Sequence, residues 1–149
     1  MSNILKIKRS ESAKRFPLIT TAKHGDVGMD LPACLPDGSI TIEPQTRGVI
    51  PTGIYLEIPE GYWASIEARS STSKSLLIVP KGVIDEGYRG ELFAVIINVG
   101  NKPVIINDGD RYVQLIMHER IIKDIIIEEC DELSPSERGC SGFGSTGRR

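Results

Sequence analysis

The chain has 149 residues, of which 40% are hydrophobic and 26% are charged, and its formal net charge is −2. This length and composition are typical of one globular domain with its own core. The negative charge argues against non-specific binding of nucleic acid, and the lack of a long apolar run or a secretory signal argues against a membrane or secreted protein.

Cysteine and histidine are sparse. Cys34, Cys130 and Cys140 are odd in number and scattered, which favours reduced thiols and an intracellular protein of the cytoplasm or nucleus, either cellular or virus-encoded. Neither His24 nor His118 belongs to a spacing that suits zinc, so we expect a buried or surface role for both.

Short β-branched segments between Gly and Pro turns dominate the chain. Strands are expected at residues 4–8, 50–58, 62–67, 91–98, 104–106, 112–117 and 121–127, and only 70–75 reads as a short helix, opened by a serine. Residues 91–98 are apolar enough to be buried on both faces. Residues 121–127 also fit one face of a helix, but consecutive isoleucines favour a strand.

This pattern predicts an all-β barrel or sandwich that forms a single domain over residues 1–149. We divide it into an N-terminal strand and connection (1–23), a β-barrel (24–133) and a flexible glycine-rich C-terminal arm (134–149).

Two loops place polar side chains just ahead of or inside a strand. The segment Gly-Asp-Val-Gly-Met-Asp-Leu at 25–31 reads as a turn before a strand, and Asp26 and Asp30 offer oxygen ligands suited to magnesium or its waters. A simple Asp/Gly turn is the alternative. The segment 109–115 also reads as a turn and a strand, and its lone polar Gln114 needs a backbone or phosphate partner.

The segment Glu-Ala-Arg-Ser-Ser-Thr-Ser at 67–73 ends one strand and enters the short helix. Arg69 beside the hydroxyls of Ser70 and Ser71 at a helix start makes a phosphate site. The alternative is a helix cap with a surface arginine.

The segment Lys-Gly-Val-Ile-Asp-Glu-Gly-Tyr-Arg-Gly at 81–90 reads as a β-hairpin. Asp85 closes its apolar strand, and a carboxylate there can deprotonate a water that attacks phosphorus. Tyr88 at the tip can pack under a sugar. Ordinary turn chemistry is the alternative.

The last residues, Arg-Gly-Cys-Ser-Gly-Phe-Gly-Ser-Thr-Gly-Arg-Arg at 138–149, cannot build a core but can wrap a nucleotide polyphosphate. The expected contact residues are Arg138, Phe143, Gly144, Ser145 and Thr146. A dinucleotide-binding loop needs a following helix that is absent here, and a Walker A loop needs a lysine after the second glycine. The remaining alternative is a disordered tail.

Together and in this order, the segments resemble the five ordered motifs of the trimeric deoxyuridine triphosphate nucleotidohydrolases (dUTPases). The motifs correspond to residues 25–31, 68–71, 82–90, 109–115 and 138–147. The resemblance implies a β-clip or jelly-roll barrel that assembles as a homotrimer with shared sites, without a nucleic-acid or membrane partner. It implies hydrolysis of dUTP to dUMP and pyrophosphate, which keeps uracil out of DNA and supplies dUMP for dTMP synthesis.

For the nucleoside end, the resemblance implies that Asp85 is the general base and also bonds the deoxyribose 3′-hydroxyl. Tyr88 would lie beneath the deoxyribose. The backbone from about Val79 to Gly82, followed by Ile84, would surround uracil.

For the phosphate end, the resemblance implies that Arg69, Ser70, Ser71 and Gln114 hold the α- and β-phosphates. Asp30 would orient water on a Mg²⁺ ion held mainly by the substrate phosphates. The tail of one chain would close a site between two others, with Arg138, Gly144, Ser145 and Thr146 on the phosphates and Phe143 over uracil.

The chain departs from the family pattern at Met29, Ala68 and Ser71, where Tyr, Pro and Gly are usual. A dCTP deaminase of the same fold is a rival, but it needs a Glu on the strand 92–98, where this chain has Val95 near the expected place. A second rival is a non-catalytic nucleotide-sensing or partner-binding protein on the same scaffold.

Overall fold

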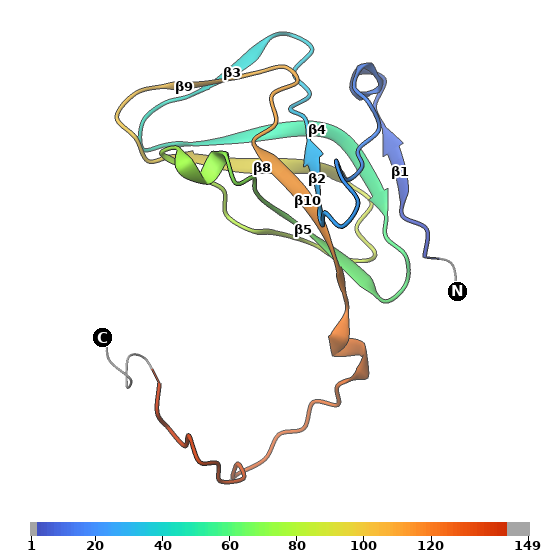
Figure 1. Cartoon of the computed structure of the whole chain (residues 1–149), viewed down its shortest axis with the longest axis vertical. Coiled ribbons are helices and arrows are strands. Elements are labelled where there is room, and N and C mark those ends of the chain that lie inside the picture. Colours follow the sequence, from blue (N-terminus) through green and yellow to red (C-terminus); the bar gives the residue numbers. More distant parts are fainter. Residues whose placement is uncertain (1–2, 143–149) are drawn as a thin grey trace.

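The computed structural model describes residues 3–142, which form mainly short antiparallel strands (Figure 1). The strands are β1 (Lys6–Arg9), β2 (Gly28–Leu31), β3 (Ser39–Ile42), β4 (Arg47–Glu57), β5 (Tyr62–Ala68), β6 (Leu77–Ile78), β7 (Gly82–Ile84), β8 (Glu91–Asn98), β9 (Val104–Asn107) and β10 (Val113–Glu119). The described helical segments are the 3-10 turns η1 (Ser12–Arg15), η2 (Thr72–Lys74) and η3 (Ile121–Asp124). The all-β prediction is confirmed.

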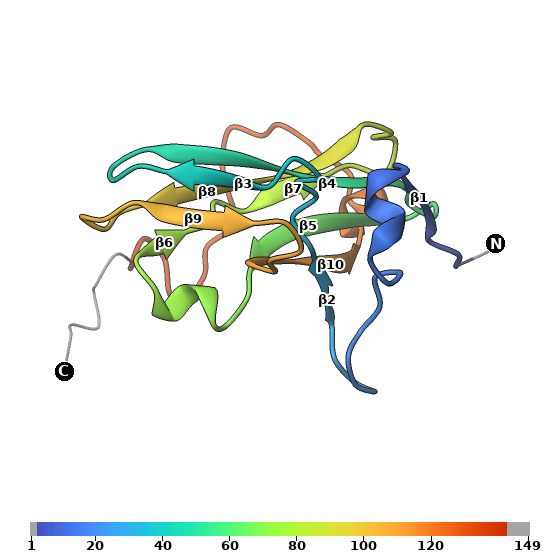
Figure 2. The same ribbon diagram turned by 90° about the horizontal axis from the view of Figure 1, so that it is seen from above.

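Two sheets face each other. The first has the strand order β1-β4-β8-β6 and the second β2-β10-β5-β7, while β3 and β9 pair separately. Seen from above, β4 and β8 lie over β5 and β10 (Figure 2). The sheets form a jelly-roll-like sandwich and do not close into one barrel. None of the helices within residues 3–142 is long and apolar enough to cross a membrane.

The core lies between the two sheets because alternate side chains of each strand point inward. Ile50 and Ile54 of β4 and Ile66 of β5 are each 2% exposed, and Leu115 of β10 is fully buried. Burying such side chains is the main favourable contribution to folding. The outward residues of the same strands are therefore free to build a site.

The prediction that 91–98 is buried on both faces is wrong for the single chain. Leu92, Ala94 and Ile96 of β8 are buried, but Phe93 on the opposite face is 47% exposed. Since only one face of this sheet meets the second sheet, the apolar residues of the other face lack a cover within the described chain.

The predicted strand at 121–127 is also wrong. Its first part is the turn η3, and the following residues have neither helix nor strand structure. A strand needs a neighbour for its N–H and C=O groups, and the described pairings supply none here. The isoleucines remain exposed, Ile126 at 92%, in a segment that extends away from the sheets (Figure 1).

Residues 81–90 do not form the predicted hairpin. β7 pairs with β5 of the second sheet, whereas β8 pairs with β4 and β6 of the first. The connection therefore crosses between the sheets. Tyr88 folds over Gly90, whose lack of a Cβ leaves room for the ring, and its hydroxyl donates to the Glu91 carbonyl at 2.9 Å.

The turns predicted before β2 and β10 are confirmed. Gly25 and Gly109 have φ values of +91° and +83°, which glycine adopts without strain. The predicted short helix at 70–75 is present as η2, and Ser71 is its N-cap residue, although no side-chain hydrogen bond caps it. These turns deliver the polar ends of β2, β5 and β10 to one place.

Candidate functional site

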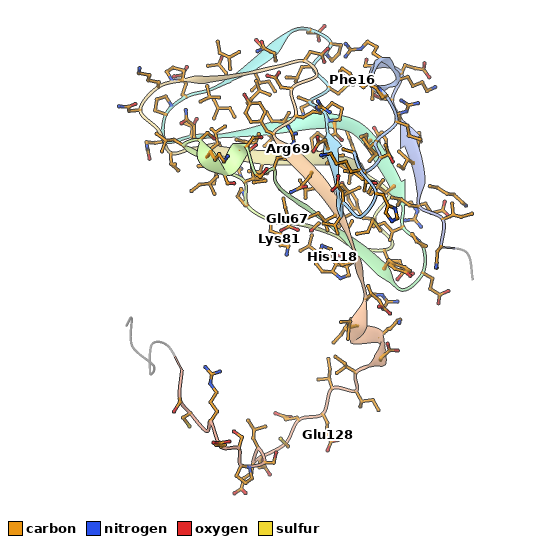
Figure 3. The ribbon with its side chains drawn as sticks, in the orientation of Figure 1. Phe16, Glu67, Arg69, Lys81, His118 and Glu128 are labelled. Carbon is orange, nitrogen blue, oxygen red and sulfur yellow. The ribbon has the colours of Figure 1, made fainter. Side chains whose placement is uncertain are left out.

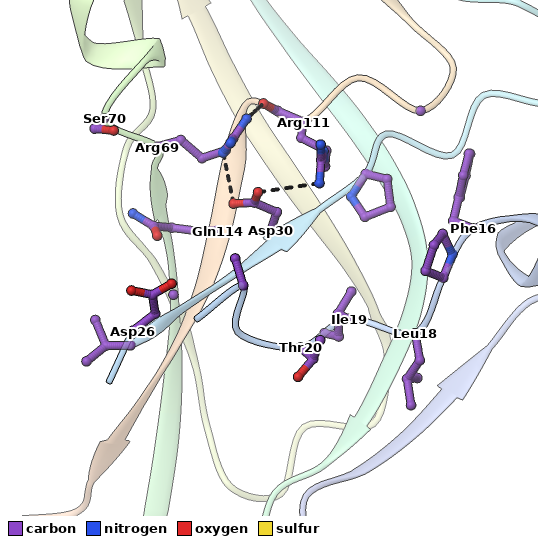
Figure 4. Close-up of a pocket in the computed structure, with 16 residues that line it drawn as sticks. Phe16, Leu18, Ile19, Thr20, Asp26, Asp30, Arg69, Ser70, Arg111 and Gln114 are labelled. Atoms are coloured by element: carbon purple, nitrogen blue, oxygen red, sulfur yellow. Dashed lines mark hydrogen bonds and ion pairs between the residues drawn. The ribbon is translucent and has the colours of Figure 1, made fainter. Parts of the chain in front are cut away.

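A cleft of about 870 Å³ opens where β2, β5 and β10 meet the N-terminal connection (Figure 4). Its polar lining includes Asp26, Asp30, Arg69, Ser70, Arg111 and Gln114. On the opposite wall lie Phe16, Leu18, Ile19 and Thr20 of the connection. The first, second and fourth predicted segments are thus brought together.

Arg69 is held in place from two directions. Its Nε lies 2.8 Å from Oδ1 of Asp30, and its Nη1 donates to the backbone carbonyl of Arg111 at 2.8 Å. The side chain is 31% exposed, so it is partly shielded from water. A guanidinium fixed by such contacts binds phosphate oxygens well.

Asp30 contacts two arginines. Besides Arg69, the Nη1 of Arg111 lies 3.7 Å from its Oδ2. The carboxylate thus orients the cations of the cleft. Across residues 3–142, no three His, Cys, Asp or Glu side chains gather in a way that could hold a metal ion.

Asp26, the other candidate carboxylate, accepts a hydrogen bond from the Lys23 N–H at 2.9 Å. This hydrogen bond agrees with the simple Asp/Gly turn, the alternative interpretation of residues 25–31.

Gln114 has the backbone partner that was expected of it. Its Nε2 donates to the Ala68 carbonyl at 2.9 Å. Its Oε1 faces Gly28 so closely that a Cβ at that position would clash. Gly28 therefore keeps room for the amide, and the side chain remains on the cleft wall.

The serines after β5 differ in their placement. Ser70 is exposed at the rim of the cleft (Figure 4), whereas Ser71 is the N-cap residue of η2 and is not among the cleft residues. Thr72 is buried and donates to the Tyr112 carbonyl at 2.6 Å, which ties the start of η2 to the residue just before β10. This bond helps to hold Arg69 and Ser70, which lie between β5 and η2, in position.

A second, smaller pocket of about 250 Å³ lies at the crossing between the sheets. It is lined by Val83, Ile84, Asp85, Tyr88, Glu91 and Phe93. Asp85 is exposed and accepts the Tyr88 N–H on its backbone carbonyl at 3.1 Å, so both side chains belong to one tight turn. Gly82 starts β7 opposite Ile66, and Val79 is half-buried against the core.

The two pockets share no lining residue. Within one chain, Asp85 and Tyr88 therefore stand apart from Arg69 and Gln114. Arg138 is exposed in the C-terminal segment, and its Nε donates to the Ser141 carbonyl at 2.9 Å. Phe143, Gly144, Ser145 and Thr146 lie outside the described residues.

A polar cluster lies on the outer face of the second sheet around Glu67 and His118 (Figure 3). Ser65 Oγ lies 2.7 Å from Nε2 of His118 and donates to Glu67 at 2.6 Å. Trp63 stacks on the His118 ring at 4.1 Å. His118 thus has a surface role that links β5 to β10.

Sequence reasoning did not assign a role to Arg111, Glu86 or Arg120. Arg111 stands in the same Gly-Asp-Arg-Tyr-Val-Gln stretch as Gln114 and could have been noticed there. Glu86 and Arg120 form an ion pair at 3.0 Å. No local sequence pattern predicts a contact between residues so far apart in the chain.

Comparison with known proteins identifies one family. Residues 14–147 match the family model described as dUTPase. The chain is 42% identical over 150 residues to the deoxyuridine 5'-triphosphate nucleotidohydrolase of Caldanaerobacter subterraneus subsp. tengcongensis, covering 99% of each chain. It is 40% identical to the protein of that name from Beijerinckia indica, covering 95% of this chain and 89% of the relative.

Solved structures agree. The dUTPase of Staphylococcus bacteriophage 80alpha with dUPNHPP superposes with a TM-score of 0.81 at 27% identity, covering 98% of this chain and 99% of that chain. The dUTPase from phage phi11 of S. aureus gives a TM-score of 0.72 at 25% identity, covering 91% and 99% of the two chains.

Proposed function

The chain belongs to the dUTPase family, and we propose how its residues divide the hydrolysis of dUTP to dUMP and pyrophosphate. The observation that carries the proposal is the presence of two separate half-sites. One is a polar cleft in which Arg69 and Arg111 offer cations to phosphates, and the other is a small pocket with an exposed carboxylate suited to a nucleoside and an attacking water.

The cleft is the proposed phosphate half-site. Arg69 presents a fixed guanidinium, Ser70 an exposed hydroxyl, and Gln114 an amide on the same wall. Because the chain has a net charge of −2, a polyanion must be held by such local donors. Ser71, which lies outside the cleft lining, would act through the backbone of the η2 start.

The pocket at the crossing is the proposed nucleoside half-site. Tyr88 is fixed by its bond to the Glu91 carbonyl and offers a ring face on which a deoxyribose can pack. The backbone from Val79 to Gly82 and the Ile84 side chain would surround the uracil. A pocket of about 250 Å³ is large enough for a base or a sugar.

We propose that a homotrimer completes the site, with the two half-sites contributed by neighbouring copies. The exposed Phe93 lines the nucleoside pocket on the uncovered face of β8, where a neighbour would bury it. The exposed isoleucines within residues 121–127 would likewise be buried against a neighbouring copy. The tail of a third copy, with Arg138, Phe143, Gly144, Ser145 and Thr146, would close the site.

Magnesium is the proposed cofactor. With both Asp30 oxygens facing arginines, the donor set fits a cation that arrives with the triphosphate, and Asp30 would contact it through bound water. The ion would neutralise phosphate charge and polarise the reacting phosphoryl group. It would be held mainly by the substrate phosphates.

In the proposed reaction, Asp85 accepts a proton from a water whose oxygen forms a bond to the α-phosphorus. The bond from the α-phosphorus to the bridging oxygen breaks, and pyrophosphate leaves with the electron pair. Arg69 would stabilise the negative charge that develops on the phosphates. Positioning and electrostatic stabilisation of this kind are the main contributions of a protein to phosphoryl chemistry.

The direct experiment measures pyrophosphate release from dUTP, UTP, dCTP and dTTP, with and without Mg²⁺. Rapid release from dUTP alone, dependent on the metal, is expected. Ammonia release from dCTP would instead support the deaminase rival, although β8 carries Val95 and no carboxylate at residues 92–98. Nucleotide binding without any release would support a sensing protein.

A further inference from the structure

Glu86 lies in the same turn as Asp85 and Tyr88, and its carboxylate binds Arg120 at the end of β10. Oε2 of Glu86 and Nη2 of Arg120 are 3.0 Å apart. Neither residue lines the cleft or the nucleoside pocket. The ion pair therefore acts on the site only through the turn that it holds.

The turn has its own internal bonds. The Tyr88 N–H donates to the Asp85 carbonyl at 3.1 Å, and Nη1 of Arg89 donates to the Glu86 carbonyl at 2.9 Å. These bonds set the shape of the turn but do not fix it to the second sheet. The start of the turn follows β7, which pairs with β5 of the second sheet, and the Glu86 side chain, 27% exposed, adds a contact from the turn to Arg120 just after β10.

Arg120 is held in place by its backbone and is partly buried. Its backbone N–H donates to the Gly61 carbonyl at 2.7 Å, which fixes the chain just after β10. Its Nε is buried, and no acceptor among residues 3–142 reaches it. A cation with one edge removed from water depends strongly on its remaining partner, and that partner is Glu86.

The C-terminal segment begins at the next residue. η3 starts at Ile121, directly after Arg120, and the methylenes of Lys123 lie close to Gly61. One side chain thus joins the turn that carries Asp85 to the point where the C-terminal segment leaves the sheets.

We propose that Arg120 is a positioning residue that, through Glu86, sets where the Asp85 carboxylate stands relative to the attacking water. This inference rests on the proposed role of Asp85. Arg120 lines neither pocket, so it would not touch substrate. A displacement of a general base by a fraction of an ångström lowers the rate while leaving phosphate binding intact.

The test compares Arg120→Gln, Glu86→Gln and Arg120→Lys with a matched control, Lys6→Gln, which removes an ion pair of the same 3.0 Å length on β1 and β4. Arg120→Gln should lower kcat for dUTP about tenfold, with inhibition by pyrophosphate unchanged. Arg120→Lys should recover part of the loss. Because Glu86→Gln leaves a partly buried cation without its partner, its loss should be at least as large.

The double variant Arg120→Gln/Glu86→Gln should be no worse than the more damaged single variant, since both remove the same contact. Amide hydrogen exchange at residues 85–88 should be faster in Arg120→Gln than in Lys6→Gln. This expectation does not depend on whether the protein hydrolyses dUTP.

Two results would overturn the inference: exchange and kcat in Arg120→Gln that match the control, or losses that multiply in the double variant. A wild-type protein without dUTP hydrolysis would instead contradict the proposed function. In that case the exchange measurement alone decides whether Arg120 holds the turn.

Discussion

Arg69 and Asp30 form the shortest ion pair of the cleft, with 2.8 Å between Nε and Oδ1. The carboxylate expected to serve a metal is thus first of all the partner of an arginine. We propose two roles for Asp30: it orients Arg69, and it would contact water on the metal ion when the nucleotide is bound.

The variant Asp30→Asn separates these roles. Losing a charge-assisted hydrogen bond costs about 1.5–3 kcal/mol, so a non-hydrolysable imido analogue of dUTP should bind about 10- to 150-fold more weakly. The loss should appear in EDTA as well as with Mg²⁺, measured by calorimetry. Asp37→Asn, on an exposed loop, is the control. A loss seen only with the metal would refute the orienting role.

Asp85→Asn tests the general base. The amide keeps the size of the carboxylate but cannot accept a proton, so kcat should fall about 10²–10⁴-fold. Binding of the imido analogue should change little, because the phosphate contacts remain. Near-normal pyrophosphate release from this variant would rule out Asp85 as the base.

Deleting residues 138–149 tests the tail. The described core lies in the two sheets, so the truncated chain should keep its folded structure and its assembly, as judged by circular dichroism and light scattering. Its hydrolysis of dUTP should nearly vanish, because the remaining site is open to water. Full activity after truncation would show that the tail is dispensable.

Asp108 links stability to pH. Its carboxylate accepts hydrogen bonds from Arg15 and from the Leu35 N–H at 2.7 Å, and the Arg15 guanidinium is the main cause that lowers the pKa of Asp108. A lowered folded-state pKa stabilises the protein above the unfolded pKa, and this contribution is lost as the pH falls through the folded value. Asp108→Asn should therefore lower Tm at pH 7, and the difference from wild type should shrink as the solution is acidified. A constant difference across that range would contradict the linkage.

The turns and strands that depend on local chemistry could be predicted from the sequence. Gly25 and Gly109 mark the turns before β2 and β10 because glycine alone adopts their positive φ readily. The order of the motif residues likewise predicted that Asp30, Arg69 and Gln114 have related roles, and the structure places them on one cleft.

The features that depend on contacts between residues far apart in the chain could not be predicted from the sequence. β7 pairs with β5 and not with β8, and nothing within 81–90 encodes that choice. The isoleucines at 121–127 carry strand propensity, but propensity without a neighbouring strand gives η3 and an extended segment. The Glu86–Arg120 ion pair is also a product of the folded arrangement.

We propose that each site joins the phosphate half of one copy to the nucleoside half of another. Two variants test it together: Asp85→Asn, which leaves the phosphate half intact, and Arg69→Gln, which leaves the nucleoside half intact. Each alone should be nearly inactive. Co-refolded in equal amounts, they should recover about a quarter of wild-type dUTP hydrolysis, since a random neighbour pair supplies both intact halves in about one site of four. Activity that stays at the level of the separate variants would contradict the claim.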